Sequence, residues 1–179
     1  MVWDKLNLAK RLQIDDIVTS LRRAVKDARA AGAQVVVVVA HAGLDPPSGT
    51  EEELPGVGPE NPMSTVAREV SGIDLIVAGH SHREYADTAI NGVLVVQPRN
   101  WATSVAVATL SLERTGRTWT VAAKHGAIVR TSGHAESKTI VDLAEPAHAA
   151  ARKYAMATVG RTAVEWRSEI GRASCRERV

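Results

Sequence analysis

Three histidines follow two apolar runs of the chain, and their positions indicate metal chemistry. His41 comes directly after the valine-rich run at 35–40, and His80 and His82 come just after the apolar run at 73–78. Imidazole nitrogens suit zinc, iron and manganese. Residues two apart on an extended backbone point to the same side, so we expect the rings of His80 and His82 to lie together.

Two buried strands must bring these histidines to one place. Residues 35–40 are β-branched and apolar on both faces, as a buried central strand requires, and residues 73–78 predict a second buried strand. In an open α/β sheet, residues just past the carboxyl ends of strands converge on one crevice. The three imidazoles are therefore expected to meet there. The alternative is that each histidine is an ordinary polar residue at a strand end.

A helix is predicted before each of these strands. Apolar residues recur at helical spacing from 14 to 28, which predicts an amphipathic helix. A shorter helix is predicted before the second strand, with Asn61 as its N-cap and Pro62 as its first residue. This alternation of helix and strand favours an α/β layer. After the first predicted strand, residues 43–62 form a long loop rich in Gly and Pro. Long loops are often functional.

The second half of the chain has a different pattern. Three runs predict antiparallel strands: 92–97, 104–112 and 119–129. Residues 115–116 predict the turn between the last two runs. A final helix is predicted over 138–157, in which Pro146 starts a second part or introduces a kink.

Asn100 and Trp101 are candidate substrate-binding residues, because a loop that follows a strand is well placed to line a crevice. The alternative for Trp101 is that it covers the core. Asp45 and Asp74 offer carboxylate oxygens, but a turn or cap role is expected for both. The remaining histidines lack ligand-like spacing and are expected to be surface or structural residues: His125, His134 and His148.

Composition excludes several classes of protein. The 179 residues are 45% hydrophobic and 23% charged, with a net charge of +2, so neither a disordered tail nor a nucleic-acid-binding stripe is indicated. The longest apolar run, at 35–40, is far shorter than the roughly 18 residues that a membrane span needs. Met1 opens no signal peptide, so any export signal is expected outside this sequence. Neither a nucleotide-binding glycine motif nor a serine nucleophile elbow is found.

The last residues are expected not to belong to the domain. Residues 169–179 show no apolar periodicity and resemble the in-frame translation of a sequencing-library adapter. They contain the one cysteine, Cys175, so cysteine content says nothing about a disulfide framework or about cellular location.

Five stretches of the sequence resemble a known family in the same order. They are Trp-Asp-Lys-Leu-Asn-Leu at 3–8, Gly-Ala-Gln at 32–34, Gly-Ile-Asp-Leu-Ile-Val-Ala-Gly-His-Ser-His at 72–82, Val-Val-Gln-Pro at 95–98 and Val-Gly-Arg-Thr at 159–162. Together they resemble the calcineurin-like metallophosphoesterases, in the branch of 5′-nucleotidases and 2′,3′-cyclic-nucleotide 2′-phosphodiesterase/3′-nucleotidases. The resemblance covers residues 1–168.

This resemblance implies an α/β/β/α sandwich, of which the chain supplies one half, with a mixed sheet and antiparallel strands in its second half. It implies a hydrolase that uses two divalent metal ions (zinc, manganese, iron or magnesium) to cleave phosphoric esters of nucleotides. His41 and His80 match positions that ligate one ion, and His82 matches a position that ligates the other. Such enzymes are exported to the periplasm or the cell surface.

The sequence also departs from the family pattern. The family's Asp-x-His, Gly-Asp-x-x-Asp and Gly-Asn-His segments do not occur here, so the bridging carboxylate and the catalytic residues are expected upstream. Residues 1–168 are then a partial catalytic domain, and the 179-residue chain by itself is predicted to be inactive. Two alternatives remain: a phosphoesterase of the same fold that acts on an ester other than a nucleotide, and a non-catalytic binding module that holds no metal.

Overall fold

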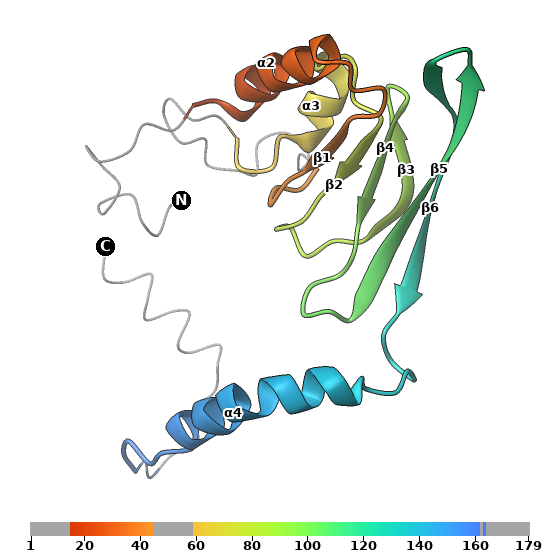
Figure 1. The fold of residues 1–179 in the computed structure, drawn as a ribbon. Coiled ribbons are helices and arrows are strands. Elements are labelled where there is room, and N and C mark those ends of the chain that lie inside the picture. Colours follow the sequence, from red (N-terminus) through yellow and green to blue (C-terminus); the bar gives the residue numbers. More distant parts are fainter. Residues whose placement is uncertain (1–14, 45–58, 162, 164–179) are drawn as a thin grey trace. The chain divides into compact units, whose positions relative to one another are not determined.

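The computed structural model describes residues 15–44, 59–161 and 163 (Figure 1). These residues form two sheets and three helices. In chain order, the elements are α2 (Ile17–Ala30), β1 (Val37–Val39), α3 (Met63–Glu69), β2 (Leu75–Val77), β3 (Tyr85–Ile90), β4 (Val93–Gln97), β5 (Ser104–Thr115), β6 (Thr118–Arg130) and α4 (Lys138–Ala155).

The first sheet is mixed and has four strands in the order β1-β2-β4-β3. Strands β1, β2 and β4 are parallel, whereas β3 is antiparallel to β4. Val39, Val77 and Val96 lie side by side in the register, so β1 and β2 end in the same row and β4 ends one residue beyond it. The chain therefore leaves all three strands at one edge of the sheet.

The second sheet is the long antiparallel hairpin of β5 and β6. Its pairing runs from Ser104 opposite Arg130 to Thr115 opposite Thr118, with an irregularity after Ser111. Asp87 of β3 joins this hairpin to the first sheet, because its Oδ1 accepts a hydrogen bond of 2.8 Å from the backbone N–H of Gly126.

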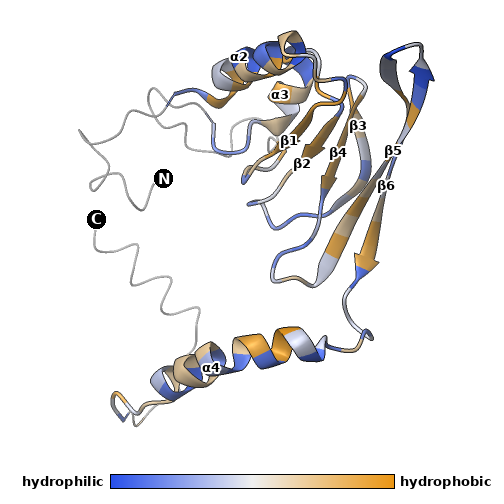
Figure 2. Cartoon of the chain, in the orientation of Figure 1, coloured by the Kyte–Doolittle hydropathy of each residue, from blue (hydrophilic) through white to orange (hydrophobic). Residues whose placement is uncertain are grey.

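The hydrophobic core has two layers, one on each face of the first sheet (Figures 1 and 2). Helices α2 and α3 cover one face, where Val25, Met63, Val66, Ile76 and Val95 are all buried. On the other face, Leu75, Leu94 and Val96 pack against Ala106 and Ala108 of β5. The sequences of β2 and β4 are continuous apolar runs because both faces of these strands are buried.

The chain divides into two compact units, Met1–Gly133 and His134–Val179. The second unit contains α4, which keeps Pro146 inside the helix and buries none of its residues. Within the described residues, no helix combines the length and the apolar character that crossing a bilayer requires.

Most predicted elements are confirmed, namely the α2, α3 and α4 helices and the strands β1, β2, β4, β5 and β6. The expectation that residues 92–97 pair only in antiparallel fashion is wrong, because β4 is parallel to β2. Strand β3 has no counterpart among the predicted strands. Its signal was the Asn91-Gly92 dipeptide, which is typical of a two-residue hairpin, and both residues adopt positive φ angles, of 49° and 78°.

Two local expectations are corrected. Within the described residues β1 is an edge strand rather than a central one, and Val37 and Val39 are 45% and 79% exposed. Asn61 is not the N-cap of α3; Pro62 occupies that position, and no side chain caps the helix. Asn61 Oδ1 instead accepts a hydrogen bond of 2.7 Å from the backbone N–H of Gly43.

Asp74 has a structural role, but in an ion pair and a backbone contact between strands rather than in the turn or cap that was expected. Its Oδ2 atom accepts a hydrogen bond of 2.6 Å from Arg29 and another of 2.8 Å from the backbone N–H of Val36. Arg29 also donates to the carbonyl oxygen of Gly72 at 2.8 Å. These bonds fasten α2 to the starts of β1 and β2, whereas the histidines follow the ends of these strands.

The close approach of β6 to β3 depends on Gly126. A Cβ atom at this position would overlap the carbonyl oxygen of Ala86 and lie 2.9 Å from Val96 Cγ1. We expect Gly126→Ala to lower the free energy of unfolding by about 1–3 kcal/mol, the usual cost of overpacking, in urea denaturation followed by circular dichroism. Gly160→Ala is the control, because no atom lies within 4 Å of a Cβ there. Equal stability of the two variants would contradict the prediction.

Candidate metal centre

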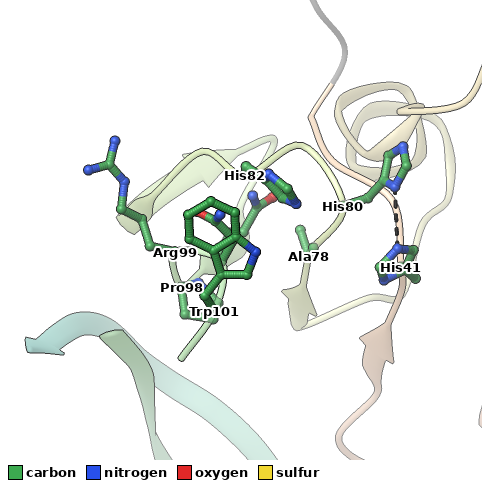
Figure 3. A pocket seen from close by; sticks show the side chains of 10 residues that line it. His41, Ala78, His80, His82, Pro98, Arg99 and Trp101 are labelled. Atoms are coloured by element: carbon green, nitrogen blue, oxygen red, sulfur yellow. Dashed lines mark hydrogen bonds between the residues drawn. The ribbon is translucent and has the colours of Figure 1, made fainter. Parts of the chain in front are cut away.

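The carboxyl ends of β1, β2 and β4 open into one cavity of about 290 Å³ (Figure 3). Every residue singled out for the site from the sequence lines it: His41, His80, His82, Asn100 and Trp101. The expected convergence at this sheet edge follows from the shared register of the three parallel strands. The rest of the lining consists of Ala78, Gly79, Gln97, Pro98 and Arg99.

His41 and His80 form a close pair. His80 Nδ1 lies 3.3 Å from His41 Nε2, and the ring centroids are 5.1 Å apart with 65° between the ring planes. Two nitrogens bound at about 2.0–2.1 Å to one tetrahedral ion lie about 3.3 Å apart. The pair therefore fits a divalent ion as two of its ligands.

Glu60 orients the His80 ring from its other side. Glu60 Oε1 lies 3.2 Å from His80 Nε2. If the neutral ring donates its Nε2 hydrogen to this carboxylate, Nδ1 keeps a free lone pair that faces His41. A carboxylate behind a metal-binding histidine is a common arrangement, because it fixes the tautomer and the ring orientation. Glu60 was not predicted as a site residue, because it lies in a loop and no spacing pattern marks it.

His82 is separated from this pair. The expectation that His80 and His82 point to the same side is wrong, because the backbone is not extended: their φ angles are 66° and 55°, in the left-handed region. Figure 3 shows His80 beside His41, on the opposite side of Ala78 from His82. The His82 ring lies instead 6.2 Å, between centroids, from that of Trp101. Each left-handed residue costs roughly 1–2 kcal/mol, which surrounding contacts must offset.

The donor set among the described residues is thus small. Within residues 15–44, 59–161 and 163, no group of three or more His, Cys, Asp or Glu side chains is gathered to hold an ion. Asp45 lies outside the described residues. His125 contacts Asp87, with its Nδ1 at 3.2 Å from Oδ2, and is 71% exposed. His41 and His80 are therefore the described residues best placed to share one ion, and His82 faces a separate position.

The loop that carries Asn100 and Trp101 forms the other wall of the cavity. Trp101 is 87% exposed, which corrects the alternative that it covers the core. Trp101 and Ala102 both adopt positive φ angles, of 59° and 53°. Thr103 holds the turn, because its hydroxyl donates to the carbonyl oxygen of Asn100 at 3.0 Å. In Figure 3 the Arg99 side chain points away from the histidines.

A polar cluster around Glu84 anchors the same loop. Glu84 accepts two hydrogen bonds from Arg130, of 2.6 and 2.7 Å, and one of 3.0 Å from the hydroxyl of Ser104. Ser104 Oγ in turn accepts from the backbone N–H of Arg99 at 2.8 Å. Hydrogen bonding from Arg130 is the largest cause of a lowered pKa for Glu84. The cluster connects the start of β5 and the end of β6 to the segment after His82.

Comparison with known proteins identifies the relatives of this chain. No protein-family model matches it. It is 33% identical to the trifunctional nucleotide phosphoesterase YfkN of Bacillus subtilis (strain 168), over 90% of this chain and 12% of that protein. It is 30% identical to the 2′,3′-cyclic-nucleotide 2′-phosphodiesterase/3′-nucleotidase of Salmonella typhimurium, over 91% of this chain and 27% of that protein.

A solved structure gives the same result for the fold. The crystal structure of the calcineurin-like phosphoesterase YfkN from Bacillus subtilis matches with a TM-score of 0.74 and 29% identity, over 86% of this chain and 49% of that one. The chain is therefore a homologue of the calcineurin-like phosphoesterases and has their fold over the part that it matches. The curated relatives are nucleotide phosphoesterases, and the chain spans 12% and 27% of their lengths.

Removal of the Glu60 carboxylate tests its role behind His80. We expect Glu60→Ala to weaken binding of Zn²⁺ to the chain by about tenfold to a hundredfold, the usual effect of losing such a partner, as measured by isothermal titration calorimetry. Glu69→Ala is the matched control, because Glu69 contacts Arg22 on the surface at 3.3 Å. The role is refuted if both variants bind Zn²⁺ as tightly as the unchanged chain.

The lowered pKa of Glu84 predicts a dependence of stability on pH. A carboxyl group whose pKa is lowered in the folded state stabilises the protein at pH values above its ordinary pKa of 4.5. This stabilisation is lost as the pH falls through the folded-state pKa. We expect Glu84→Gln to be less stable than the unchanged chain at pH 7, with a smaller difference at pH 3. Urea denaturation at both pH values measures this. A difference that does not depend on pH would contradict it.

Proposed function

We propose that this chain is part of a metal-dependent phosphoesterase that hydrolyses nucleotides, of the 2′,3′-cyclic-nucleotide phosphodiesterase or 3′- or 5′-nucleotidase type. His41 and His80 bind one divalent ion in this proposal, and His82 binds a second. The ion is zinc, manganese, iron or magnesium. The sequence similarity to nucleotide phosphoesterases supports the substrate class.

One observation carries the proposal. Two imidazole nitrogens 3.3 Å apart face each other at the ends of adjacent parallel strands, and a carboxylate lies 3.2 Å behind one of them. Both features together fit two imidazole ligands of one ion, with the His80 ring oriented by a carboxylate.

The residues of the cavity have separate tasks in this proposal. His41, His80 and His82 hold the ions, and Glu60 keeps the His80 lone pair directed at its ligand position. The ions supply positive charge for the phosphate group and an activated water for its hydrolysis. Trp101 presents an exposed aromatic ring beside His82, where it can contact the nucleotide together with Asn100.

The boundaries and location of the parent protein belong to the same proposal. Residues 1–168 form part of its catalytic domain, whereas residues 169–179 derive from an adapter sequence. The bridging carboxylate and the catalytic residues lie in a part of the parent that this chain does not include. The parent acts in the periplasm or at the cell surface.

Metal binding and turnover test the proposal together. We expect the 179-residue chain to bind about one Zn²⁺ or Mn²⁺ ion weakly and His41→Ala and His80→Ala to weaken this binding by at least about tenfold, because each removes one of two adjacent donors. His125→Ala is the control, since His125 lies outside the cavity. Calorimetry gives the affinity, and inductively coupled plasma mass spectrometry gives the stoichiometry.

Turnover is measured with bis-p-nitrophenyl phosphate and added Mn²⁺. We expect none from the chain, because its described residues gather no third ligand around the histidine pair. The longer gene product is expected to hydrolyse 2′,3′-cyclic nucleotides and to contain stoichiometric metal. Metal-free purification of that product would favour a binding module, and turnover of other phosphoesters in place of nucleotides would favour a relative with a different substrate.

A further inference from the structure

Gln97 is a buried polar residue at the edge of the candidate metal centre. It is the last residue of β4, lies at the cavity and is only 1% exposed. Burial of a side-chain amide is unfavourable unless its donors and acceptor are satisfied. Its partners therefore indicate why glutamine is at this position.

The Gln97 amide binds the chain at two points around His82. Its Nε2 donates to the carbonyl oxygen of Arg83 at 2.8 Å and to the hydroxyl of Ser81 at 2.9 Å. A carbonyl oxygen only accepts, so the amide nitrogen must face Arg83, which determines the orientation of the amide. The Ser81 hydroxyl also lies 3.3 Å from Gln97 Oε1. The amide thus holds the residue before His82 and the residue after it.

Ser81 is held from its other side as well. A Cβ atom on Gly43 would lie 2.6 Å from both Cβ and Oγ of Ser81, so the segment after β1 packs directly against this turn. The backbone N–H of Ser81 also donates to the carbonyl oxygen of Gly79 at 2.7 Å. Ser81 therefore has little room to move between the two left-handed histidines.

We propose that Gln97 is a positioning residue of the candidate metal centre: its amide holds His80 and His82 in the left-handed conformations that direct their two rings to different sides. The inference rests on the proposed function where it concerns metal affinity, but it concerns the geometry of the turn whether or not metal binds. Left-handed conformations of residues other than glycine persist only where surrounding contacts impose them. Gln97 supplies such contacts on both sides of His82.

The test compares Gln97→Leu with Val95→Ala. Leucine fills a similar volume at the end of β4 but lacks the amide hydrogens. Val95→Ala is the control: it removes part of a fully buried side chain of the same strand, on the face that packs against the helices. Two quantities are measured: the backbone coupling constants of His80 and His82 by NMR spectroscopy, which report φ, and the affinity for Zn²⁺ by calorimetry. Ser81→Ala is a milder third variant that leaves the bond to Arg83 in place.

We expect Gln97→Leu to change both coupling constants and to weaken Zn²⁺ binding by about tenfold or more. Ser81→Ala is expected to have smaller effects on both quantities. Val95→Ala is expected to change neither. Unchanged coupling constants in a folded Gln97→Leu protein would overturn the inference. If Gln97→Leu does not fold, unchanged constants in Ser81→Ala would overturn it, and changed constants would support it. Failure of the unchanged chain to bind Zn²⁺ would count against the proposed function alone, and the coupling constants would still decide the role of Gln97.

Discussion

The parallel pairing of β1, β2 and β4 is the constraint on which the candidate site depends. Because Val39, Val77 and Val96 share one row of the sheet, the segments that follow them leave the same edge. His41, the His80-Ser81-His82 turn and Gln97 are brought together by this register rather than by any direct sequence proximity.

The site combines backbone strain with dense polar support. Two histidines in left-handed conformations are unfavourable by themselves, and they lie beside a network in which Gln97, Ser81 and Gly43 leave little free space. The opposite wall follows the same principle, because the positive φ angles of Trp101 and Ala102 occur in a loop anchored through Ser104 to Glu84 and Arg130. Strain of this kind is typical of functional sites, where the surrounding fold imposes one arrangement of the reactive groups.

Sequence reasoning succeeded where one periodicity dominated. The amphipathic spacing of α2 and the valine run of β1 predicted their elements, and the position of histidines after two such strands predicted a common crevice. It failed where long-range contacts competed with local rules. Asn61 has good capping chemistry, but its side chain binds the backbone of Gly43, so Pro62 takes the N-cap position. β3 lacks a strong alternating pattern and pairs with β4 through a hairpin turn that was overlooked.

The sequence by itself determined the α/β class, the resemblance to calcineurin-like phosphoesterases and the identity of the candidate ligands, because hydrophobic periodicity and short motifs are local properties of the chain. Only the tertiary structure decided how those ligands are oriented. It placed Glu60 behind His80, directed His82 towards Trp101, and set the Gln97 amide against the turn. Side-chain direction depends on backbone conformation and on contacts between residues distant in the sequence, and neither is encoded in the spacing of residues along the chain.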